Sequence, residues 1–311
     1  MQKVIISPPL VSVVIPVFNG ALYLRKAVES VQKSTFKNFE ILLIDDGSTD
    51  ASHALCRELE KEYSENVRYY IFSENQGLGR VLNFALKEAH GEYICRLNQD
   101  DIMLPHRIQT QVDYLTQHPD VVALGSSIHL FDENHDSQLV HFASTDEDIK
   151  RYWHIVSPFA DPSVMYRRDV ALKAGGYKQE FWPADDTHLW YRMGQIGKLA
   201  NLQEPVVHVR WHTQAASVKH FRSLNWSTYR MHRWAHSHVA RASIFVQLFW
   251  VLQVVCGVIF SAQFNWAAYR IMKKIMYQMR LFNARVLRAT TSRIAVMSVM
   301  NQPNKLNTSG Q

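Results

Sequence analysis

Cysteine is scarce in this chain of 311 residues. Its three cysteines, Cys56, Cys95 and Cys256, are far apart in the sequence and form no C-x-x-C pair. This spacing argues against a disulfide framework and against a zinc site, and it fits a protein that works in a reducing compartment. Because 47% of the residues are hydrophobic, the chain can bury a substantial core, as one large domain or as a domain with an appendage.

Acidic residues are absent after Glu204. Residues 1–204 carry 20 Lys and Arg against 28 Asp and Glu, a net charge of −8, whereas residues 205–311 carry 14 Lys and Arg and no acid, a net charge of +14. The C-terminal third is therefore expected to meet an anionic partner, either nucleic acid or the anionic face of a membrane. Nucleic acid is the less favoured partner, because no recognised binding module accompanies the charge.

The beginning of the chain has no long apolar run. Pro8 and Pro9 interrupt the first short apolar segment, and Pro16 stops the segment that begins at Val11. A secretory signal peptide contains a longer uninterrupted apolar stretch. The N-terminal region is therefore predicted to stay in the cytosol.

Short apolar segments alternate with helical patterns through the first 125 residues. The predicted strands are residues 11–16, 39–44, 67–72, 92–95 and 121–125. This alternation predicts an α/β fold with a mostly parallel sheet that helices cover on both faces. Residues 126–160 show weak periodicity and are expected to form an antiparallel excursion with loops. Two further strands are predicted at residues 164–166 and 205–212.

Polar side chains stand where two of these strands stop. The strand at 39–44 is followed by Asp45 and Asp46, and the strand at 92–95 by Asn98, Gln99, Asp100 and Asp101. Parallel strands end at a common edge, where open α/β sheets bind their ligands. Adjacent carboxylates are costly to bury without neutralisation, and oxygen ligands suit Mg²⁺ or Mn²⁺ carrying a phosphate. The alternative is that Asp100 and Asp101 cap a helix beginning near Pro105. Ser48 or Thr49 is likewise expected to cap the helix that runs to residue 59.

A second acidic pair and a basic turn occur later in the chain. Asp185 and Asp186 immediately precede a helical pattern. They are interpreted either as residues that cap the helix and stabilise its start through the helix dipole or as a general base at the mouth of a site. Arg210 and His212 end the last predicted strand, where a phosphate-handling site needs positive groups opposite its acidic residues. A lone histidine is more often structural, so both roles stay open for His212.

These clusters, in this order, resemble the family 2 glycosyltransferases with a GT-A fold, and most of all the bacterial enzymes that build surface polysaccharide and lipopolysaccharide. The resemblance covers about residues 10–217. The segments that carry it are residues 13–19, 44–50, 75–83, 96–101, 184–190 and 210–217. It implies a Rossmann-like GT-A domain over residues 1–220. It also implies an inverting enzyme that moves a sugar from a nucleotide-diphosphate donor, a UDP-sugar, to a hydroxyl of a lipid-linked saccharide or lipopolysaccharide acceptor.

The resemblance implies a role for each motif. Asp186 would be the catalytic base with Asp185 beside it, and Mg²⁺ or Mn²⁺ would be bound by Asp100, Asp101 and His212. The residues implied to bind the nucleotide sugar are Pro16, Phe18, Asp45, Asp46, Asn75, Gly77, Arg80, Asn98, Gln99 and Arg210. Among these, Phe18 and Asp46 would lie at the nucleotide base. The chain departs from the family pattern at Asn98, where the family carries Asp, and this removes one charge from the metal site.

Two other classes of protein compete with this assignment. A non-catalytic sugar-nucleotide-binding or scaffolding protein is suggested by Asn98. A nucleotidyltransferase would carry a glycine-rich loop after its first strand, and this loop is absent after Ile15. A dinucleotide site is rejected, because the glycines at Gly77 and Gly79 lack a third member and follow the third strand instead of the first.

The C-terminal region combines apolar and basic segments. No charged residue lies between Arg241 and Arg270, and residues 244–260 are almost entirely apolar. This run is long enough to span a bilayer, but basic residues flank both ends, against the positive-inside tendency. Residues 271–279 show the pattern of a basic amphipathic helix.

We therefore expect residues 221–300 to be a helical membrane-associating region. It would bind the anionic cytoplasmic face of the inner membrane peripherally or monotopically. The alternatives are a membrane-spanning helix, a buried helix pair that closes the domain, and the interface of a homodimer. Residues 301–311 are expected to be a disordered tail.

Overall fold

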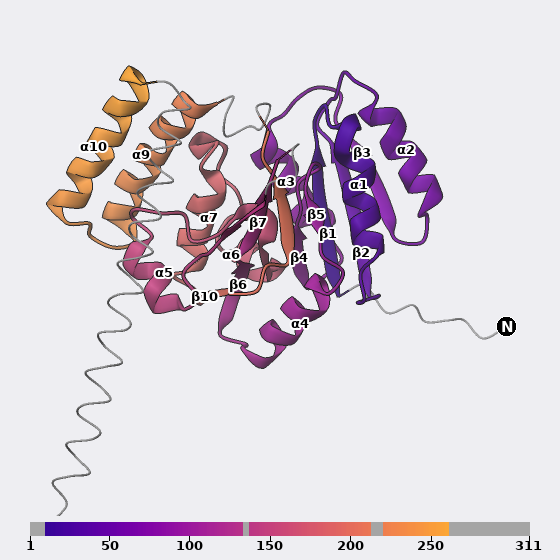
Figure 1. The fold of residues 1–311 in the computed structure, drawn as a ribbon, viewed down its shortest axis with the longest axis horizontal. Helices are drawn as coiled ribbons and strands as arrows, with labels where there is room; N and C mark the ends of the chain where they lie inside the picture. Colours follow the sequence, from indigo (N-terminus) through magenta and orange to yellow (C-terminus); the bar gives the residue numbers. More distant parts are fainter. Residues whose placement is uncertain (1–9, 133–136, 213–219, 261–311) are drawn as a thin grey trace, which may run out of the picture. The chain divides into compact units, whose positions relative to one another are not determined.

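The computed structural model describes residues 10–132, 137–212 and 220–260 (Figure 1). The chain divides into a compact unit at Met1–Val255 and a second unit at Cys256–Gln311. The predicted boundary at residue 220 does not coincide with the end of the first unit. The predictions for residues 271–279 and 301–311 lie outside the described residues.

The first unit is built on a seven-stranded sheet with the order β10-β6-β9-β4-β1-β2-β3. Its strands are β1 Val11–Val17, β2 Phe39–Asp45, β3 Val67–Ile71, β4 Tyr93–Arg96, β6 Val121–Ser126, β9 Met165–Arg167 and β10 Lys198–Leu202. Neighbouring strands run parallel except β9, which is antiparallel to both β4 and β6. The sheet is therefore mixed, and the predicted parallel sheet is confirmed apart from this one strand.

Helices cover both faces of this sheet, as predicted (Figure 1). Successive residues of β1 point to opposite faces, so Val13 packs into one apolar cluster and Val14 into the other. The helices in the cluster of Val13 are α1 Ala21–Gln32, α2 Ser52–Glu62 and α4 Arg107–Gln117. Those in the cluster of Val14 are α3 Leu78–Glu88, α5 Asp146–Tyr152, α6 Arg168–Lys173 and α7 Asp185–Met193. Burial on both faces explains why the sequence of β1 is a continuous apolar run.

A second, four-stranded sheet has the order β5-β11-β7-β8. Its strands are β5 Ile102–Met103, β11 Val207–Arg210, β7 Ile128–Phe131 and β8 Ser137–Val140. The antiparallel pair of β7 with β8 agrees with the excursion predicted for residues 126–160. The sequence did not predict that β11 would join this pair and also meet β5, which directly follows Asp101.

Two C-terminal helices complete the described chain, α9 Phe221–His238 and α10 Ile244–Ile259. Met231 and Ala235 of α9 pack with Tyr191 of α7 in a buried cluster. Trp250 of α10 is buried as well. Across residues 10–132, 137–212 and 220–260, the structure contains no helix with the length and apolar character that a membrane span requires.

Glu40 ties together the amino ends of the central strands. Its carboxylate accepts hydrogen bonds from Ser12 Oγ at 2.6 Å, from the backbone N–H of His90 at 2.7 Å and from Arg68 Nη1 at 2.8 Å. Burial by itself raises the pKa of this carboxyl, but the hydrogen bonds from Ser12, Arg68 and His90 outweigh it, so the pKa of Glu40 lies below its ordinary value. A lowered pKa in the folded state stabilises the protein above the pKa of the unfolded chain.

We expect Glu40→Gln to lower the free energy of unfolding by about 1.5–3 kcal/mol at pH 7, because charge-assisted hydrogen bonds are lost. The difference from wild type should shrink as the pH falls below about 4.3, the pKa of an unfolded glutamate, and towards the lower folded pKa. Urea unfolding of both proteins at pH 7 and at acid pH measures this difference in the free energy of unfolding. Exposed Glu65→Gln is the matched control, and an equal effect of both substitutions at all pH values would contradict this account.

Candidate active site

The carboxyl ends of β4, β1 and β2 lie side by side and form the edge that we call the donor edge. The parallel registers pair Val14 with Arg96 and Val17 with Asp45. The segments that follow these strands, residues 18–20, 46–50 and 97–101, therefore begin next to one another. The prediction that the two groups of carboxylates share one edge of the sheet is confirmed.

Gln99 holds the loop that carries Phe18. Its side-chain amide accepts the N–H of Phe18 at 2.9 Å and donates to the carbonyl of Phe18 at 3.0 Å. A side chain at Gly20 would collide with this amide, which explains the glycine there. The ring of Phe18 is 45% exposed at the donor edge, as an aromatic that stacks on a ligand requires. Gln99 thus positions Phe18, and its own predicted contact with the donor stays a prediction.

Asp46 organises the loop before α3. Its two carboxylate oxygens accept the backbone N–H groups of Gln76 at 2.7 Å and Gly77 at 2.9 Å. Gly77 has a φ of 88°, a left-handed conformation that favours glycine. Arg80 donates to the side chain of Gln76 at 2.6 Å. Asp46, Gly77 and Arg80 are therefore brought together as predicted, although this geometry by itself gives Asp46 a structural role.

Asn75 lies in the same loop. Its backbone packs against the turn after β2, since a Cβ at Gly47 would lie 2.8 Å from the backbone nitrogen of Asn75. Asp45 is fully buried and accepts the N–H of Ser48 at 2.9 Å, so it shapes the turn after β2. The expectation that Ser48 or Thr49 caps the following helix is wrong, since α2 begins only at Ser52.

Asp100 and Asp101 face in different directions. Asp101 is buried, and its two oxygens accept the N–H of Arg210 at 2.8 Å and the side-chain amide of Asn98 at 3.0 Å. Burial, followed by the charge of Asp100, raises the pKa of Asp101 well above its ordinary value. Asp100 is partly exposed and lies 2.8 Å from Nε2 of His212. Asp101 is therefore a support for the site, and Asp100 is the carboxylate that a ligand can reach.

The helix-capping alternative for Asp100 and Asp101 is wrong. Strand β5 lies between them and α4, whose N-cap is His106. The chain departs from the family pattern at Asn98, and the structure gives a reason: the side-chain amide of Asn98 donates a hydrogen bond to Asp101. An ionised carboxylate at position 98 has no hydrogen to donate.

Arg210 and His212 reach the same place from β11. The guanidinium of Arg210 lies over the rings of Tyr23, at 4.6 Å, and Phe131, at 4.5 Å. The rings of His212 and Tyr23 are 5.6 Å apart. Tyr23 and Phe131 were not identified from the sequence, where one belongs to an ordinary helical pattern and the other to a segment of weak periodicity.

The donor set fits Mg²⁺ or Mn²⁺ shared with a phosphate. Oδ2 of Asp100 meets His212, and no hydrogen bond from a described residue reaches its Oδ1. Magnesium in phosphate-transferring sites is bound through one or two carboxylates, with the remaining ligands supplied by phosphate and water. Among residues 10–132, 137–212 and 220–260, no group of three or more His, Cys, Asp or Glu forms a metal site by itself. Asp100 and His212 would thus supply only part of the coordination of a bound cation, and the other ligands would come from the donor.

The second acidic pair begins α7. The N-cap is Ala184, and no side chain caps the helix. Both acids lie in the first turn, so stabilisation of the helix start stays an explanation for them beside the general base. Asp185 is buried, and its Oδ2 finds no hydrogen-bond donor among the described residues. A Cβ at Gly79 would lie 2.9 Å from this oxygen, which places Asp185 against the first turn of α3.

Burial raises the pKa of both carboxyls, that of Asp185 to about 7 and that of Asp186 to about 8. For Asp186 the charges of Asp161 and Asp185 add to the effect of burial. Oδ1 of Asp186 accepts the N–H of Thr187 at 2.5 Å. A carboxylate whose pKa lies near neutrality is suited to take up a proton during a reaction.

A buried ion pair, Arg96 with Asp161, connects the two acidic regions. The guanidinium of Arg96 is completely buried and contacts Oδ2 of Asp161 at 2.9 Å and Oδ1 of Asn98 at 3.3 Å. Asp161 belongs to the short 3-10 turn η1, Asp161–Ser163, and its charge acts on both Asp185 and Asp186. The sequence analysis missed Asp161. The available signal was Arg96, a charged residue at the end of a strand that is otherwise apolar.

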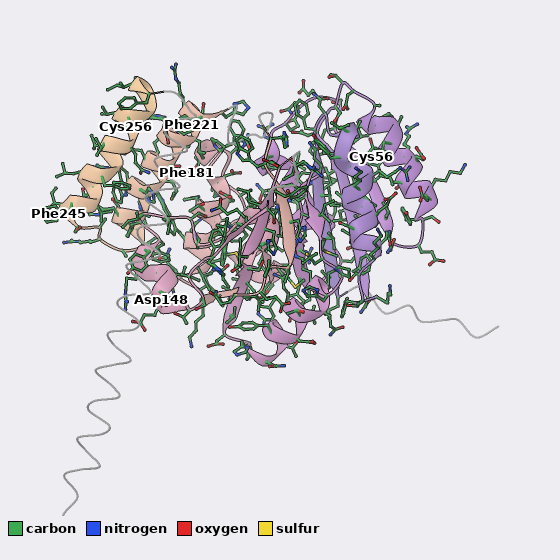
Figure 2. All side chains as sticks on the ribbon, in the orientation of Figure 1. Cys56, Asp148, Phe181, Phe221, Phe245 and Cys256 are labelled. Carbon is green, nitrogen blue, oxygen red and sulfur yellow. The ribbon has the colours of Figure 1, made fainter. Side chains whose placement is uncertain are left out.

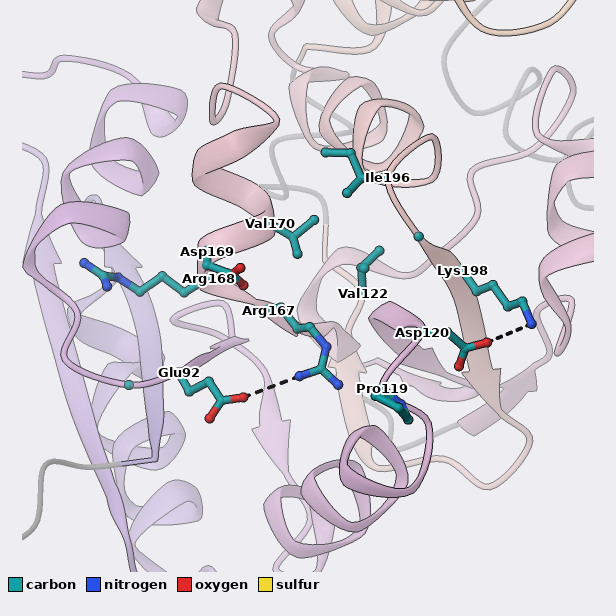
Figure 3. A pocket seen from close by; sticks show the side chains of 12 residues that line it. Glu92, Pro119, Asp120, Val122, Arg167, Arg168, Asp169, Val170, Ile196 and Lys198 are labelled. Carbon is teal, nitrogen blue, oxygen red and sulfur yellow. Dashed lines mark hydrogen bonds and ion pairs between the residues drawn. The ribbon is translucent and has the colours of Figure 1, made fainter.

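A pocket of about 790 Å³ lies at the opposite edge of the sheet, before β4, β6 and β10 (Figure 3). Its charged groups neutralise one another, with Arg167 lying 3.4 Å from Glu92 and Lys198 lying 2.7 Å from Asp120. None of the predicted site residues lines it. The pocket is therefore distinct from the donor edge.

Comparison with known proteins decides the family. Residues 12–175, more than half of the chain, match Glycosyl transferase family 2. The chain belongs to this family. The predicted resemblance is confirmed, and the protein is a glycosyltransferase with a GT-A-like α/β fold and a mixed sheet.

Two curated relatives and one solved structure illustrate the similarity. The amylovoran biosynthesis glycosyltransferase AmsE of Erwinia amylovora is 30% identical over 190 residues, which cover 60% of this chain and 70% of that protein. The UDP-Gal:alpha-D-GlcNAc-diphosphoundecaprenol beta-1,3-galactosyltransferase of Escherichia coli is 27% identical, covering 67% and 76%. The mannosyltransferase PcManGT of Pyrobaculum calidifontis, in complex with GDP-Man and Mn²⁺, superposes with a TM-score of 0.56 at 16% identity and covers 96% of this chain and 89% of that one. For some other relatives the match spans as little as 15% of their length.

We expect Asp161→Asn to lower the apparent pKa of Asp186, because a neighbouring negative charge that favours its protonated form is removed. The amide oxygen of Asn can still accept a hydrogen bond from Arg96, although the buried guanidinium loses its negative partner. Carboxyl ¹³C NMR of the labelled protein measures the titration. Exposed Asp169→Asn, which removes a charge that pairs with Lys173, is the matched control. An unchanged pKa of Asp186 in Asp161→Asn would contradict the assigned electrostatic role.

Proposed function

We propose that this protein is an inverting, metal-assisted glycosyltransferase that moves a sugar from a UDP-sugar to a hydroxyl of a lipid-linked saccharide. The observation that carries the proposal is the pair Asp185 and Asp186, two carboxyls with pKa values near neutrality that are linked to the donor edge. The links run through Asp161 and Arg96 to Asn98, and through Gly79 and Gly77 to Asp46.

The donor would lie across the donor edge. The exposed ring of Phe18 would stack on the base, and the loop that Asp46 holds would contact the nucleoside. The diphosphate would lie near Asp100, Arg210 and His212, where Arg210 and His212 offer positive charge to the leaving group. A bound Mg²⁺ or Mn²⁺, held by Asp100 and His212, would supply neutralisation of the charge that develops on the diphosphate.

Asp186 would act as the base. Its carboxylate takes the proton of the acceptor hydroxyl while the hydroxyl oxygen forms a bond to the anomeric carbon. The bond from that carbon to the diphosphate oxygen breaks, and UDP leaves with the electron pair. One displacement inverts the configuration, and no covalent enzyme intermediate is needed, in contrast to retaining enzymes with two carboxylates. Asp185, buried against α3, would support Asp186 without contacting the acceptor.

The lipid-linked acceptor is supported by one relative, whose name describes a diphosphoundecaprenol-linked substrate. A lipid carrier of this kind lies in a membrane, which agrees with the cationic C-terminal third of the chain. We propose the cytoplasmic face of the inner membrane as the site of action. A homodimer stays a possible assembly that the experiments below test.

Asp186→Asn should lower sugar transfer by about 10²–10⁴-fold, because the amide cannot take up the acceptor proton. UDP binding should stay within roughly twofold of wild type, since the residue is assigned no donor contact. Isothermal titration with UDP and a radiolabelled transfer assay measure the two quantities. Asp113→Asn on α4 is the control. Loss of UDP binding together with transfer would mean that Asp186 is structural.

Chelation of divalent cations should lower UDP release from the UDP-sugar, and added Mn²⁺ or Mg²⁺ should restore it. Asp100→Asn should weaken the response to the cation by roughly tenfold or more, whereas Asp101→Asn should lower the melting temperature, because Asn cannot accept both of its hydrogen bonds. UDP release at graded Mn²⁺ and thermal unfolding distinguish the two. A protein that binds UDP but never releases it from a panel of UDP-sugars would instead be a non-catalytic binding or scaffolding protein.

A further inference from the structure

One face of α10 is apolar and exposed. Ile244, Phe245, Leu248, Val251, Leu252 and Val255 follow helical spacing, and Phe245 projects from the outer side of the helix (Figure 2). The exposed fraction of the side chains reaches 79% at Phe245 and is 59% at Leu248 and 57% at Leu252. We call these six residues the α10 face.

The rotation of α10 about its axis is fixed by contacts on its other side. Trp250 is buried, and its indole N–H donates to the carbonyl of His154 at 2.7 Å. Its ring stacks on His232 of α9, with the ring centres 5.1 Å apart and the planes 3° apart. These contacts of Trp250 hold the opposite side of α10 against the protein, so the α10 face points outward.

Such a face is unusual for a helix on a water-exposed surface. The outward side of a surface helix normally carries polar or charged residues, and a contiguous exposed apolar patch marks an interaction site. Every member of the α10 face is a large aliphatic or aromatic residue. The patch therefore requires an apolar partner.

The surrounding charge selects the partner. Exposed cations on α9 and before α10 are Arg222, Arg230, Arg233 and Arg241, and no acidic residue follows Glu204. In a symmetric dimer through this face, the same cationic surroundings would meet each other. Residues 261–311 carry eight Lys and Arg and no acid, so covering the face with this segment would also bring like charges together. A surface that is apolar inside and anionic outside, which is the surface of an anionic bilayer, matches both properties.

We propose that the α10 face docks onto an anionic lipid bilayer, with α10 lying in the interfacial plane and the neighbouring arginines contacting lipid headgroups. This inference deepens the proposed function, because it would bring the donor edge to a membrane-borne acceptor. It needs only the described geometry of α10, so the docking can be tested separately from catalysis.

The test compares two double variants of the full chain. Leu248→Gln with Leu252→Gln removes apolar surface from the α10 face. Leu172→Gln with Ile196→Gln, at residues that are 43% and 51% exposed elsewhere in the first unit, is the matched control. Flotation with vesicles of phosphatidylglycerol and phosphatidylcholine, and with phosphatidylcholine alone, measures binding. Light scattering after size exclusion measures the oligomeric state, and UDP release from a UDP-sugar in detergent-free solution measures catalysis.

Wild type and the Leu172/Ile196 control should float with the anionic vesicles and bind pure phosphatidylcholine weakly. The Leu248/Leu252 variant should lose roughly tenfold or more in vesicle affinity, at unchanged UDP release. If wild type and the control are dimers and the Leu248/Leu252 variant is a monomer, the proposal is overturned in favour of a second copy of the chain on the α10 face. If wild type is a monomer that does not bind anionic vesicles, the proposal is overturned in favour of residues 261–311 as the partner of the α10 face. Vesicle binding without UDP release from any UDP-sugar would support the docking and contradict the proposed catalysis.

Discussion

The buried carboxylate of Asp101 joins the two sheets, and the arrangement of the donor edge depends on it. One oxygen accepts the N–H of Arg210 at the end of β11, and the other accepts the amide of Asn98 after β4. Burying a carboxylate is costly, and these two bonds offset only part of that cost, because burial and the charge of Asp100 still raise the pKa of Asp101 well above its ordinary value. With Asp101 turned inward, Asp100 points outward and meets His212. A single desolvated group thus brings residues that are more than a hundred positions apart onto one site.

This arrangement gives a physical reason for Asn98, the residue at which the chain departs from the pattern of its family. The amide of Asn98 receives a hydrogen bond from Arg96 on one side and donates one to Asp101 on the other. A carboxylate could serve the first contact but not the second without binding a proton. Asn98 therefore removes a negative charge that would face Asp101 and leaves Asp100 as the accessible carboxylate.

The ion pair of Arg96 and Asp161 carries electrostatic coupling from the donor edge to α7. Arg96 is completely buried, so its charge requires a close partner, and Asp161 supplies it. Oδ1 of Asp161 is buried without a hydrogen-bond donor among the described residues, and the negative charge that remains acts on Asp186. A proton acceptor with a pKa near neutrality is thus produced by burial and by neighbouring carboxylates together.

The sequence by itself determined the alternation of strands and helices, the meeting of carboxylates at one edge and the family. It could do so because β-branched runs, strand-ending turns and motif order are local properties of the chain. Only the tertiary structure decided that Asp100, and not its neighbour Asp101, is accessible. That choice depends on β11, whose residues lie far along the chain from both. The antiparallel insertion of β9, the stacking of Tyr23 and Phe131 on Arg210, and the pairing of Asp161 with Arg96 were likewise invisible in the sequence, because each arises from contacts between segments that only the folded chain brings together.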